Sequence, residues 1–170
     1  MKRLFCLITI LVAGSWCVQA QTGVYGAFSA ANYNLPNIGW KYGPTFGLYS
    51  EPFGVPFVKV GLDIRASLLG SGNEKLDSIL GGVRVQLHPH VVPVMPYAEA
   101  LGGLAHVNVG QGAAFTNANG FQYQLLGGVD VTLAPHLDWR AVEYAWGSVR
   151  TTGEDFDPQM VSTGIVVRLP

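Results

Sequence analysis

The chain has 170 residues, of which 49% are hydrophobic and 12% are charged, and its formal net charge at pH 7 is −1. Soluble domains carry roughly 25% charged residues, so this composition argues against an ordinary soluble domain. The near-neutral balance also argues against nucleic-acid binding, which needs a strongly basic face.

Residues 1–20 have the pattern of a cleavable signal peptide. Lys2 and Arg3 come first, the short apolar run Leu4–Gly14 follows, and Val18-Gln19-Ala20 supplies a cleavage site. The apolar run is too short for a transmembrane helix, which needs roughly 20 residues. We therefore expect cleavage before Gln21 and a single domain over residues 21–170.

Both cysteines, Cys6 and Cys17, lie in the expected signal peptide, so the domain is predicted to have no disulfide and no thiol chemistry. A lipoprotein signal built on Cys17 is an alternative, but the bulky Trp16 stands where such a signal has a small residue. Removal of Lys2 and Arg3 leaves eight basic (10 − 2) and 11 acidic residues, a formal charge of −3.

After residue 20 the hydrophobicity is carried by alternation, which is typical of membrane β-barrels. The clearest case is Val58–Leu69, where apolar side chains alternate with residues such as Lys59, Asp63 and Arg65. This period of two predicts a strand with one apolar and one polar face. Similar segments predict eight strands in all. They are Val24–Tyr33, Thr45–Ser50, Val58–Leu69, Ile79–Leu87, Tyr97–Val109, Phe121–Leu133, Leu137–Arg150 and Val161–Leu169.

The predicted connections alternate in length, as they do in outer-membrane barrels. With the N-terminus in the periplasm, the mostly longer loops face outward: 34–43, 70–76, 110–120 and 151–160. The shorter links 51–56, 89–95 and 134–136 face the periplasm. Because loops on a rigid scaffold often carry function, we expect extracellular contacts from this region. The candidate contact residues are Trp40, Tyr42, Phe115, Asn117, Asn119 and Phe156.

Aromatic residues gather near the predicted strand ends, as in the two aromatic belts of membrane proteins. On the periplasmic side these are Phe53, Phe57, Tyr97 and Trp139, and on the outer side they are Tyr33, Trp40, Tyr42, Phe121, Tyr123 and Trp146.

Three short segments carry a resemblance to a known family: Gly-Val-Tyr-Gly-Ala-Phe-Ser at 23–29, Pro-Tyr-Ala-Glu-Ala-Leu-Gly-Gly at 96–103, and Gly-Ile-Val-Val-Arg-Leu at 164–169. With the eight-strand pattern, residues 23–170 resemble the small outer-membrane β-barrel family related to the OmpA transmembrane domain and to OmpX. The resemblance implies an eight-stranded antiparallel up-and-down transmembrane β-barrel, inserted by the barrel-assembly machinery. Such barrels usually end in an aromatic residue, whereas this chain ends Arg168-Leu169-Pro170.

An eight-stranded barrel has an interior just wide enough for side chains to fill it. Charged groups on the inner faces should pair there, because an unpaired buried charge is costly. The polar network expected in the lumen comprises Asp63, Arg65, Arg84, Gln86, Glu99, Gln122, Gln124, Asp130 and Arg168. Arg140 and Glu143 are three residues apart and would fall on opposite faces of a regular strand. Either a bulge places both inside, or Arg140 lies at the membrane rim.

Candidate catalytic and metal residues are sparse. His88 and His90 flank Pro89, but no nearby cysteine or carboxylate completes a metal site. Ser148 and His106 are the best candidates for lipid deacylation, yet the chain has no Gly-x-Ser-x-Gly elbow. We therefore expect no catalytic residue, no metal and no cofactor.

The sequence therefore predicts a non-enzymatic bacterial outer-membrane protein with a structural or surface-interaction role. The expected partners are outer-membrane lipid and lipopolysaccharide, with no nucleic acid, and the expected state is a monomer. One alternative is a secreted soluble barrel that holds an apolar ligand as lipocalins do, in which case the apolar faces would point inward. A second alternative is a lipid-modifying barrel enzyme.

Overall fold

The computed structural model describes residues 21–32, 39–71, 74–89, 92–109, 116–150 and 155–169. The predicted signal peptide, His90 and the contact candidate Phe115 lie outside these ranges, and only the backbone of Asn117 is described. No helix among the described residues is long and apolar enough to cross a membrane.

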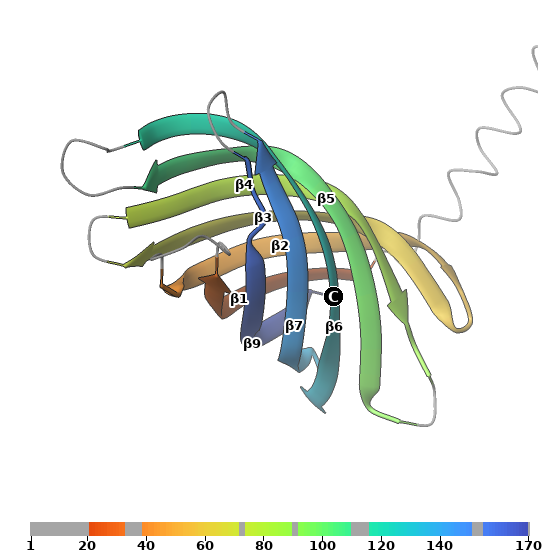
Figure 1. Cartoon of the computed structure of the whole chain (residues 1–170). Helices are drawn as coiled ribbons and strands as arrows, with labels where there is room; N and C mark the ends of the chain where they lie inside the picture. The colour runs from red at the N-terminus through yellow and green to blue at the C-terminus, as the bar shows by residue number, and fades with distance from the viewer. Residues whose placement is uncertain are drawn as a thin grey trace, which may run out of the picture.

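The described residues form one closed antiparallel sheet (Figure 1). Each strand from β1 to β7 pairs with the next along the chain, and β9 pairs with both β7 and β1 to close the barrel. The two-residue β8 pairs only with the end of β7, so eight long strands make the wall, as predicted. The strands are β1 (Gln21–Asn32), β2 (Lys41–Val55), β3 (Val58–Ser71), β4 (Glu74–Leu87), β5 (Val94–Val109), β6 (Thr116–Ala134), β7 (Leu137–Arg150), β8 (Asp155–Phe156) and β9 (Gln159–Leu169).

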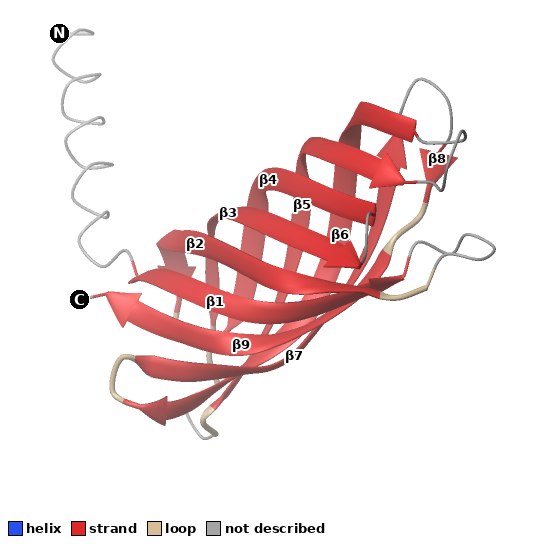
Figure 2. Cartoon of the chain, turned by 90° about the vertical axis from the view of Figure 1, so that its left-hand side faces the viewer, coloured by secondary structure: helices blue, strands red, loops and turns tan. Residues whose placement is uncertain are grey.

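The start of β1 and the end of β9 lie side by side at one end of the barrel, which we call the terminal end (Figure 2). The other end, which carries the β1–β2, β3–β4, β5–β6 and β7–β9 connections, is called the far end. At the terminal end, the turn predicted at 134–136 is present and joins β6 to β7. Its His136 has a φ of 67°, a left-handed conformation that histidine adopts more readily than most residues.

The alternation predicted for β3 is seen in the structure. Asp63 and Arg65 are each 1% exposed and face the lumen, whereas Leu62 and Ile64 are 62% and 55% exposed on the outer wall. Successive side chains of a strand point to opposite faces, so the polar set of β3 lies inside and its apolar set outside.

Several strands extend beyond their predicted ends, because the ladder continues where the apolar pattern stops. The segment 51–56, predicted as a link, is largely strand: β2 runs to Val55, and the register shifts between Ser50 and Phe53. Pro52 lies in this irregularity, where a missing N–H costs no ladder bond. The predicted loop at 70–76 is also shorter, since β3 runs to Ser71 and β4 begins at Glu74.

Arg140 and Glu143 both face the lumen, each 1% exposed, so the placement of Arg140 at the rim is wrong. The pairing of β6 with β7 shifts by one residue, because Val129 pairs with Val142 and Asp130 pairs with Arg140. The extra residue in β7 changes the parity of the strand, as a β-bulge does.

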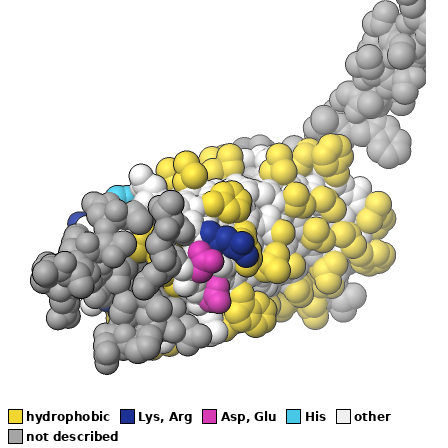
Figure 3. Space-filling view, turned by 45° about the horizontal axis from the view of Figure 1, so that its top comes forward, with side chains coloured by type: hydrophobic (Ala, Val, Ile, Leu, Met, Phe, Trp, Pro, Cys, Tyr) yellow, Lys and Arg dark blue, Asp and Glu magenta, His cyan; other side chains and the backbone are white. Residues whose placement is uncertain are grey.

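The outer wall is a broad apolar band (Figure 3). Aromatic side chains near the terminal end are Phe53, Phe57 and Trp139, and those toward the far end are Phe28, Tyr42, Phe46, Phe121, Tyr123 and Trp146. The prediction that Tyr97 belongs to the outer belt is wrong, because Tyr97 is 5% exposed and faces the lumen.

Candidate functional site

The lumen holds the most unusual chemistry of the described chain. Three arginines, Arg65, Arg84 and Arg140, are each at most 1% exposed. They come from β3, β4 and β7, and carboxylates from five strands surround them. The carboxylates are Glu51, Asp63, Glu99, Asp130 and Glu143.

Ion pairs join three arginines and three carboxylates into a closed circuit, which we call the lumen ring. In order, its members are Arg65, Glu99, Arg84, Asp130, Arg140 and Glu143. Each carboxylate bridges two arginines, so opposite charges alternate all the way round. Charge-assisted hydrogen bonds of this kind are stronger than those between neutral groups.

The distances within the ring are short. Nη2 of Arg65 lies 2.6 Å from Oε2 of Glu99, and Nη1 lies 2.7 Å from Oε1 of Glu143. Nη1 of Arg84 lies 2.5 Å from Oε1 of Glu99, and Nη2 lies 3.0 Å from Oδ2 of Asp130. Glu99 therefore uses both of its oxygens, one for each arginine.

Arg140 completes the circuit from β7. Its Nε lies 3.1 Å from Oδ1 of Asp130, and its Nη1 lies 3.2 Å from Oε2 of Glu143. The same Glu143 oxygen accepts a hydrogen bond of 2.7 Å from the hydroxyl of Tyr97.

Two further carboxylates flank the ring. Asp63 accepts from the hydroxyl of Tyr25 at 2.9 Å and lies 3.5 Å from Nε of Arg65. Glu51 on β2 lies 3.0 Å from Nε of Arg84. Ring and flanks together therefore connect side chains from β1 through β7, so the interaction ties most of the wall to one central cluster.

Tyr25, Tyr49 and Tyr97 lie over the arginines, and each ring packs against a glycine of the neighbouring strand. Arg84 lies 4.3 Å and 3.9 Å from the ring centroids of Tyr49 and Tyr97, and Arg140 lies 4.1 Å from that of Tyr25, within the range of cation–π contacts. A Cβ added to the Tyr97 partner Gly128 would stand only 2.5 Å from that tyrosine's Cζ. The glycines therefore make room for the aromatic rings inside the barrel.

Toward the far end the lumen becomes apolar. A buried cluster fills it, and its larger members are Leu69, Leu76, Leu80, Leu101, Val107, Leu126, Val149 and Met160. Beside it, hydroxyls bridge four strands, because Ser29 bonds Ser162 and Thr45 at 2.8 Å each and Thr45 donates to Ser67 at 3.0 Å. The described interior is thus filled by side chains, a charged middle followed by an apolar segment.

The remaining residues predicted for the lumen are also placed there. The Gln86 amide lies between Glu51 and Arg84, and in its favoured orientation it bonds both. Gln122 and Gln124 are each 3% exposed, and each has a side-chain oxygen without a described partner. Arg168 lies nearer the terminal end, where its Nε is 3.0 Å from Asp138 without the geometry of a hydrogen bond.

The sequence did not identify several lumen residues. The alternation predicts Glu51 in a link, leaves the facing of Arg140 and Glu143 open, and does not indicate that Tyr25 and Tyr49 face inward. In β2 every second residue from Lys41 onward lies on the inner face, and Tyr49 and Glu51 both belong to this set. Continuing the alternation to residue 51 identifies both.

The predicted contact residues have different surroundings. Trp40 and Tyr42 are 45% and 50% exposed, but Tyr42 belongs to β2, where it stacks on Phe28 at 6.3 Å between ring centroids. Asn119 is exposed on β6 and lies 2.8 Å from Nδ1 of His106. Phe156 instead packs against the apolar cluster of the lumen.

The candidate catalytic pair is not assembled. Ser148 on β7 pairs with a residue of β6, whereas His106 lies on β5, one strand farther round the wall. Ser148 is 6% exposed. Among the described residues, no group of three or more His, Cys, Asp or Glu side chains is arranged to hold a metal ion.

Comparisons with known proteins agree with this architecture. No protein-family model matches the chain, and no curated protein matches it either. Among solved structures, it is similar to Neisserial surface protein A (TM-score 0.58, 15% identity, 88% of this chain and 97% of that one). It is also similar to Ail, the attachment invasion locus protein of Yersinia pestis (TM-score 0.55, 10% identity, 88% of this chain and 97% of that one).

A third similar structure is the N-terminal β-barrel domain of Pseudomonas aeruginosa OprF (TM-score 0.54, 12% identity, 89% of this chain and 100% of that one). Identities this low establish the fold alone. The resemblance stated from the sequence is therefore confirmed at the level of architecture: the chain has the fold of the small eight-stranded outer-membrane β-barrels.

Proposed function

We propose that the protein is a non-enzymatic β-barrel of the bacterial outer membrane, with a structural or surface-interaction role. The observation that carries the proposal is the distribution of polarity: buried arginines and carboxylates fill the middle of the lumen, while Leu, Ile, Val and Phe side chains cover the outer wall. Such a wall is stable in lipid and exposes a large apolar surface in water.

This distribution argues against a soluble ligand-binding barrel. That alternative requires the apolar faces to line a cavity, yet Leu62, Ile79 and Leu104 are 62%, 66% and 72% exposed on the outside. The separation of Ser148 from His106 argues against lipid deacylation by this pair.

The similar structures support the proposed location, because they include a Neisserial surface protein and the N-terminal β-barrel domain of OprF. In the proposed orientation the terminal end faces the periplasm and the far end faces outward. The far end then presents Trp40, Tyr42 and Asn119 toward the surface. We further propose that the barrel-assembly machinery inserts the chain, that lipopolysaccharide surrounds it, and that it acts as a monomer.

The test is a comparison of unboiled and boiled outer membranes on a denaturing gel. A folded, detergent-resistant barrel migrates differently before boiling, so a heat-dependent shift in the outer-membrane fraction is expected. Recovery in the soluble periplasmic fraction without a shift would contradict the proposal.

The filled lumen leads to a second expectation. Purified barrel added to a planar lipid bilayer should produce no stable ion channel, because side chains occupy the described interior. Steady conductance steps would contradict the structural role and favour a transport role.

A further inference from the structure

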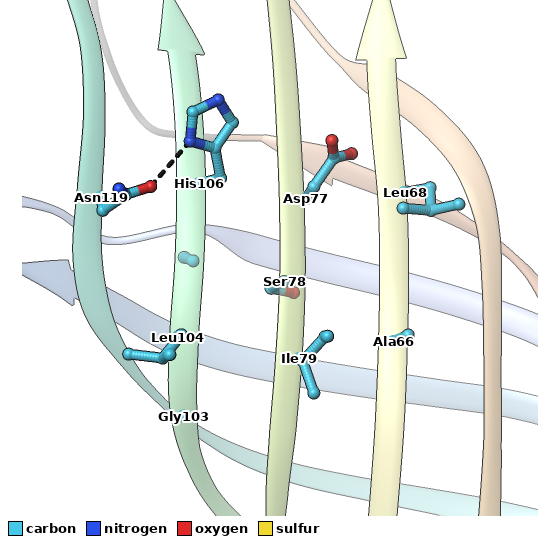
Figure 4. Close-up of a pocket in the computed structure, with 10 residues that line it drawn as sticks. Ala66, Leu68, Asp77, Ser78, Ile79, Gly103, Leu104, His106 and Asn119 are labelled. Carbon is cyan, nitrogen blue, oxygen red and sulfur yellow. Dashed lines mark hydrogen bonds between the residues drawn. The ribbon is translucent and has the colours of Figure 1, made fainter.

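The outer wall has a hollow near the far end, across β3, β4, β5 and β6 (Figure 4). It has a volume of about 610 Å³, within the range of roughly 300–1,000 Å³ typical of ligand sites. Two rows of outward-facing side chains border it. The polar row, toward the far end, is Leu68, Asp77, His106 and Asn119, and the apolar row, toward the terminal end, is Ala66, Ile79 and Leu104.

The boundary between the apolar and the charged part of the wall passes through this hollow. Ile79 and Leu104 are 66% and 72% exposed in the apolar row. Two residues nearer the far end on β4, Asp77 carries a carboxylate, and two residues beyond it Lys75 carries an ammonium group. A charge on the lipid face of a barrel is costly at the bilayer midplane and is tolerated near the interface. The polar row therefore lies at the level of the lipid headgroups, and the apolar row lies where the acyl chains begin.

The aromatic belt of the wall is interrupted at the hollow. The apolar row continues to Phe46 on β2, which pairs with Ala66, and to Phe121 on β6, which pairs with Leu104. Between these two strands, the segments of β3, β4 and β5 contain one Phe, Tyr or Trp residue, Tyr97, and it faces the lumen. Aromatic rings usually occupy the boundary between acyl chains and headgroups, so their absence from the outer face here leaves room for another molecule.

The polar row offers two hydrogen-bond acceptors to an occupant of the hollow. Oδ1 of Asn119 lies 2.8 Å from Nδ1 of His106 and accepts its proton, so neutral His106 presents Nε2 as an acceptor. Asp77 pairs with His106 across the ladder, so its carboxylate and the imidazole extend from neighbouring strands in one row (Figure 4). An occupant that matches this row therefore has N–H or O–H donors directly beside an apolar part.

A second hollow of about 350 Å³ adjoins the first on the side of the far end and shares Leu68 and Asp77 with it. It is lined by Lys75, whose side chain is exposed. Within the described part of the chain, neither Lys75 nor Asp77 forms an ion pair with another side chain. Lys75 can therefore bind an anionic group of the same occupant, farther from the acyl region than Asp77.

We propose that the two hollows hold one lipopolysaccharide molecule by its lipid A part, a phosphorylated glucosamine disaccharide with amide-linked and ester-linked acyl chains. One amide-linked chain lies along the apolar row. Its amide N–H and a neighbouring hydroxyl donate to Asp77 and to Nε2 of His106, and a phosphate accepts from Lys75. The inference deepens the proposed function and rests on it, because it requires the far end to lie in the outer leaflet.

A glycerophospholipid matches the same groups less well. Its acyl chains are joined by esters, which have only acceptor oxygens at the boundary with the hydrocarbon, where Asp77 and His106 also present acceptors. Lipid A has amide N–H groups at that boundary. In the proposed orientation, lipopolysaccharide is also the lipid of the leaflet in which the hollow lies.

The experiment is native mass spectrometry of the full barrel in detergent after lipid removal. Purified diphosphoryl lipid A and phosphatidylglycerol are each added alone. Both lipids carry phosphate and acyl chains, but phosphatidylglycerol has no amide-linked chain. Retention of one lipid A per barrel is expected, with loss of phosphatidylglycerol at the same collision energy.

Ala66→Trp fills the hollow beside the apolar row and should lower the retention of lipid A about tenfold, which corresponds to about 1.4 kcal/mol. The matched control is Ala98→Trp, which changes an exposed alanine of the outer wall that does not line the hollow and should leave retention unchanged. Lys75→Gln should lower retention several-fold by removing the phosphate contact. Its control is Arg150→Gln, which removes an exposed cation that lines neither hollow.

Equal retention of lipid A by the wild type, Ala66→Trp and Lys75→Gln would overturn the site. Equal retention of phosphatidylglycerol and lipid A would overturn the assignment of the occupant. The heat-dependent gel shift of the same samples shows whether each variant is folded and separates this inference from the proposed function: a barrel that shifts but retains no lipid A refutes only the lipid A site.

Discussion

The lumen ring predicts that removing an arginine destabilises the barrel more than removing a carboxylate. Three guanidinium groups face five carboxylates in ring and flanks, counting Glu51 and Asp63. Arg65→Met leaves two against five, and Asp63 then keeps only the Tyr25 hydroxyl as its described partner. Breaking a buried pair by removing one partner costs roughly 3–5 kcal/mol, so we expect a loss in that range.

Glu143→Gln is the milder change. Three guanidinium groups then face four carboxylates: Arg65 keeps Asp63 and Glu99, and Arg140 keeps Asp130. The amide retains the volume and one acceptor oxygen. The expected loss is about 1.5–3 kcal/mol, the range for a hydrogen bond to a charged group.

The assay is guanidinium-induced unfolding of the barrel in detergent, followed by the heat-dependent gel shift. Arg150→Met provides the control, because Arg150 is exposed on the outer side of β7 and the same substitution there should change stability by less than about 0.5 kcal/mol. If Arg65→Met is no more destabilising than Arg150→Met, or less so than Glu143→Gln, the ring does not hold the barrel together as argued.

Three other changes test separate parts of the structure by unfolding or by the heat-dependent gel shift. Gly128→Ala places a Cβ 2.5 Å from Cζ of Tyr97 and should cost about 1–3 kcal/mol by overpacking; wild-type stability would show that the ring of this tyrosine moves freely. Leu62→Arg puts a charge on the outer wall and should cost up to about 2–4 kcal/mol in lipid vesicles; no loss would favour a wall exposed to water. Deletion of Ala141 removes the bulge but leaves Arg140 and Glu143 two residues apart, so a regular strand still turns both toward the lumen and the heat-dependent shift should be retained; loss of the shift would show that the bulge itself is required.

The sequence predicts the barrel well where the polarity of the residues alternates in step with the inward and outward positions of the strand. In β3 the outward residues are apolar and the inward ones include Asp63 and Arg65, so the period of two identifies both strand and facing. In β2 the inward-facing positions include glycines and the outward-facing positions include Pro44 and Phe46, so the inner and outer faces do not differ clearly in polarity. The strand was predicted at less than half its length for this reason, and Glu51 was assigned to a link.

Tyrosine was the second source of error, because an aromatic residue near a strand end was assigned to the outer belt. Tyr97 lies inside because its hydroxyl bonds Glu143 and its ring lies 3.9 Å from the Arg84 guanidinium. Gly128, which lies opposite Tyr97 in register, has no side chain, and the tyrosine ring occupies the space beside it. All three lumen tyrosines pair with a glycine across strands, but so do the outward-facing Tyr42 and Tyr123, so the pairing alone does not determine the facing.

The bulge in β7 explains how the ring closes although Arg140 and Glu143 are three residues apart. A regular strand offers inward positions two residues apart, and both then lie on one line along the strand. Arg140 and Glu143 are three positions apart, which would put them on opposite faces of a regular strand, and the extra residue Ala141 turns both inward, where they pair with each other. Arg140 then reaches Asp130 on the adjacent strand, while Glu143 extends across the lumen to Arg65 on β3. The irregularity that makes the sequence ambiguous at this point is thus the feature that joins the two sides of the barrel.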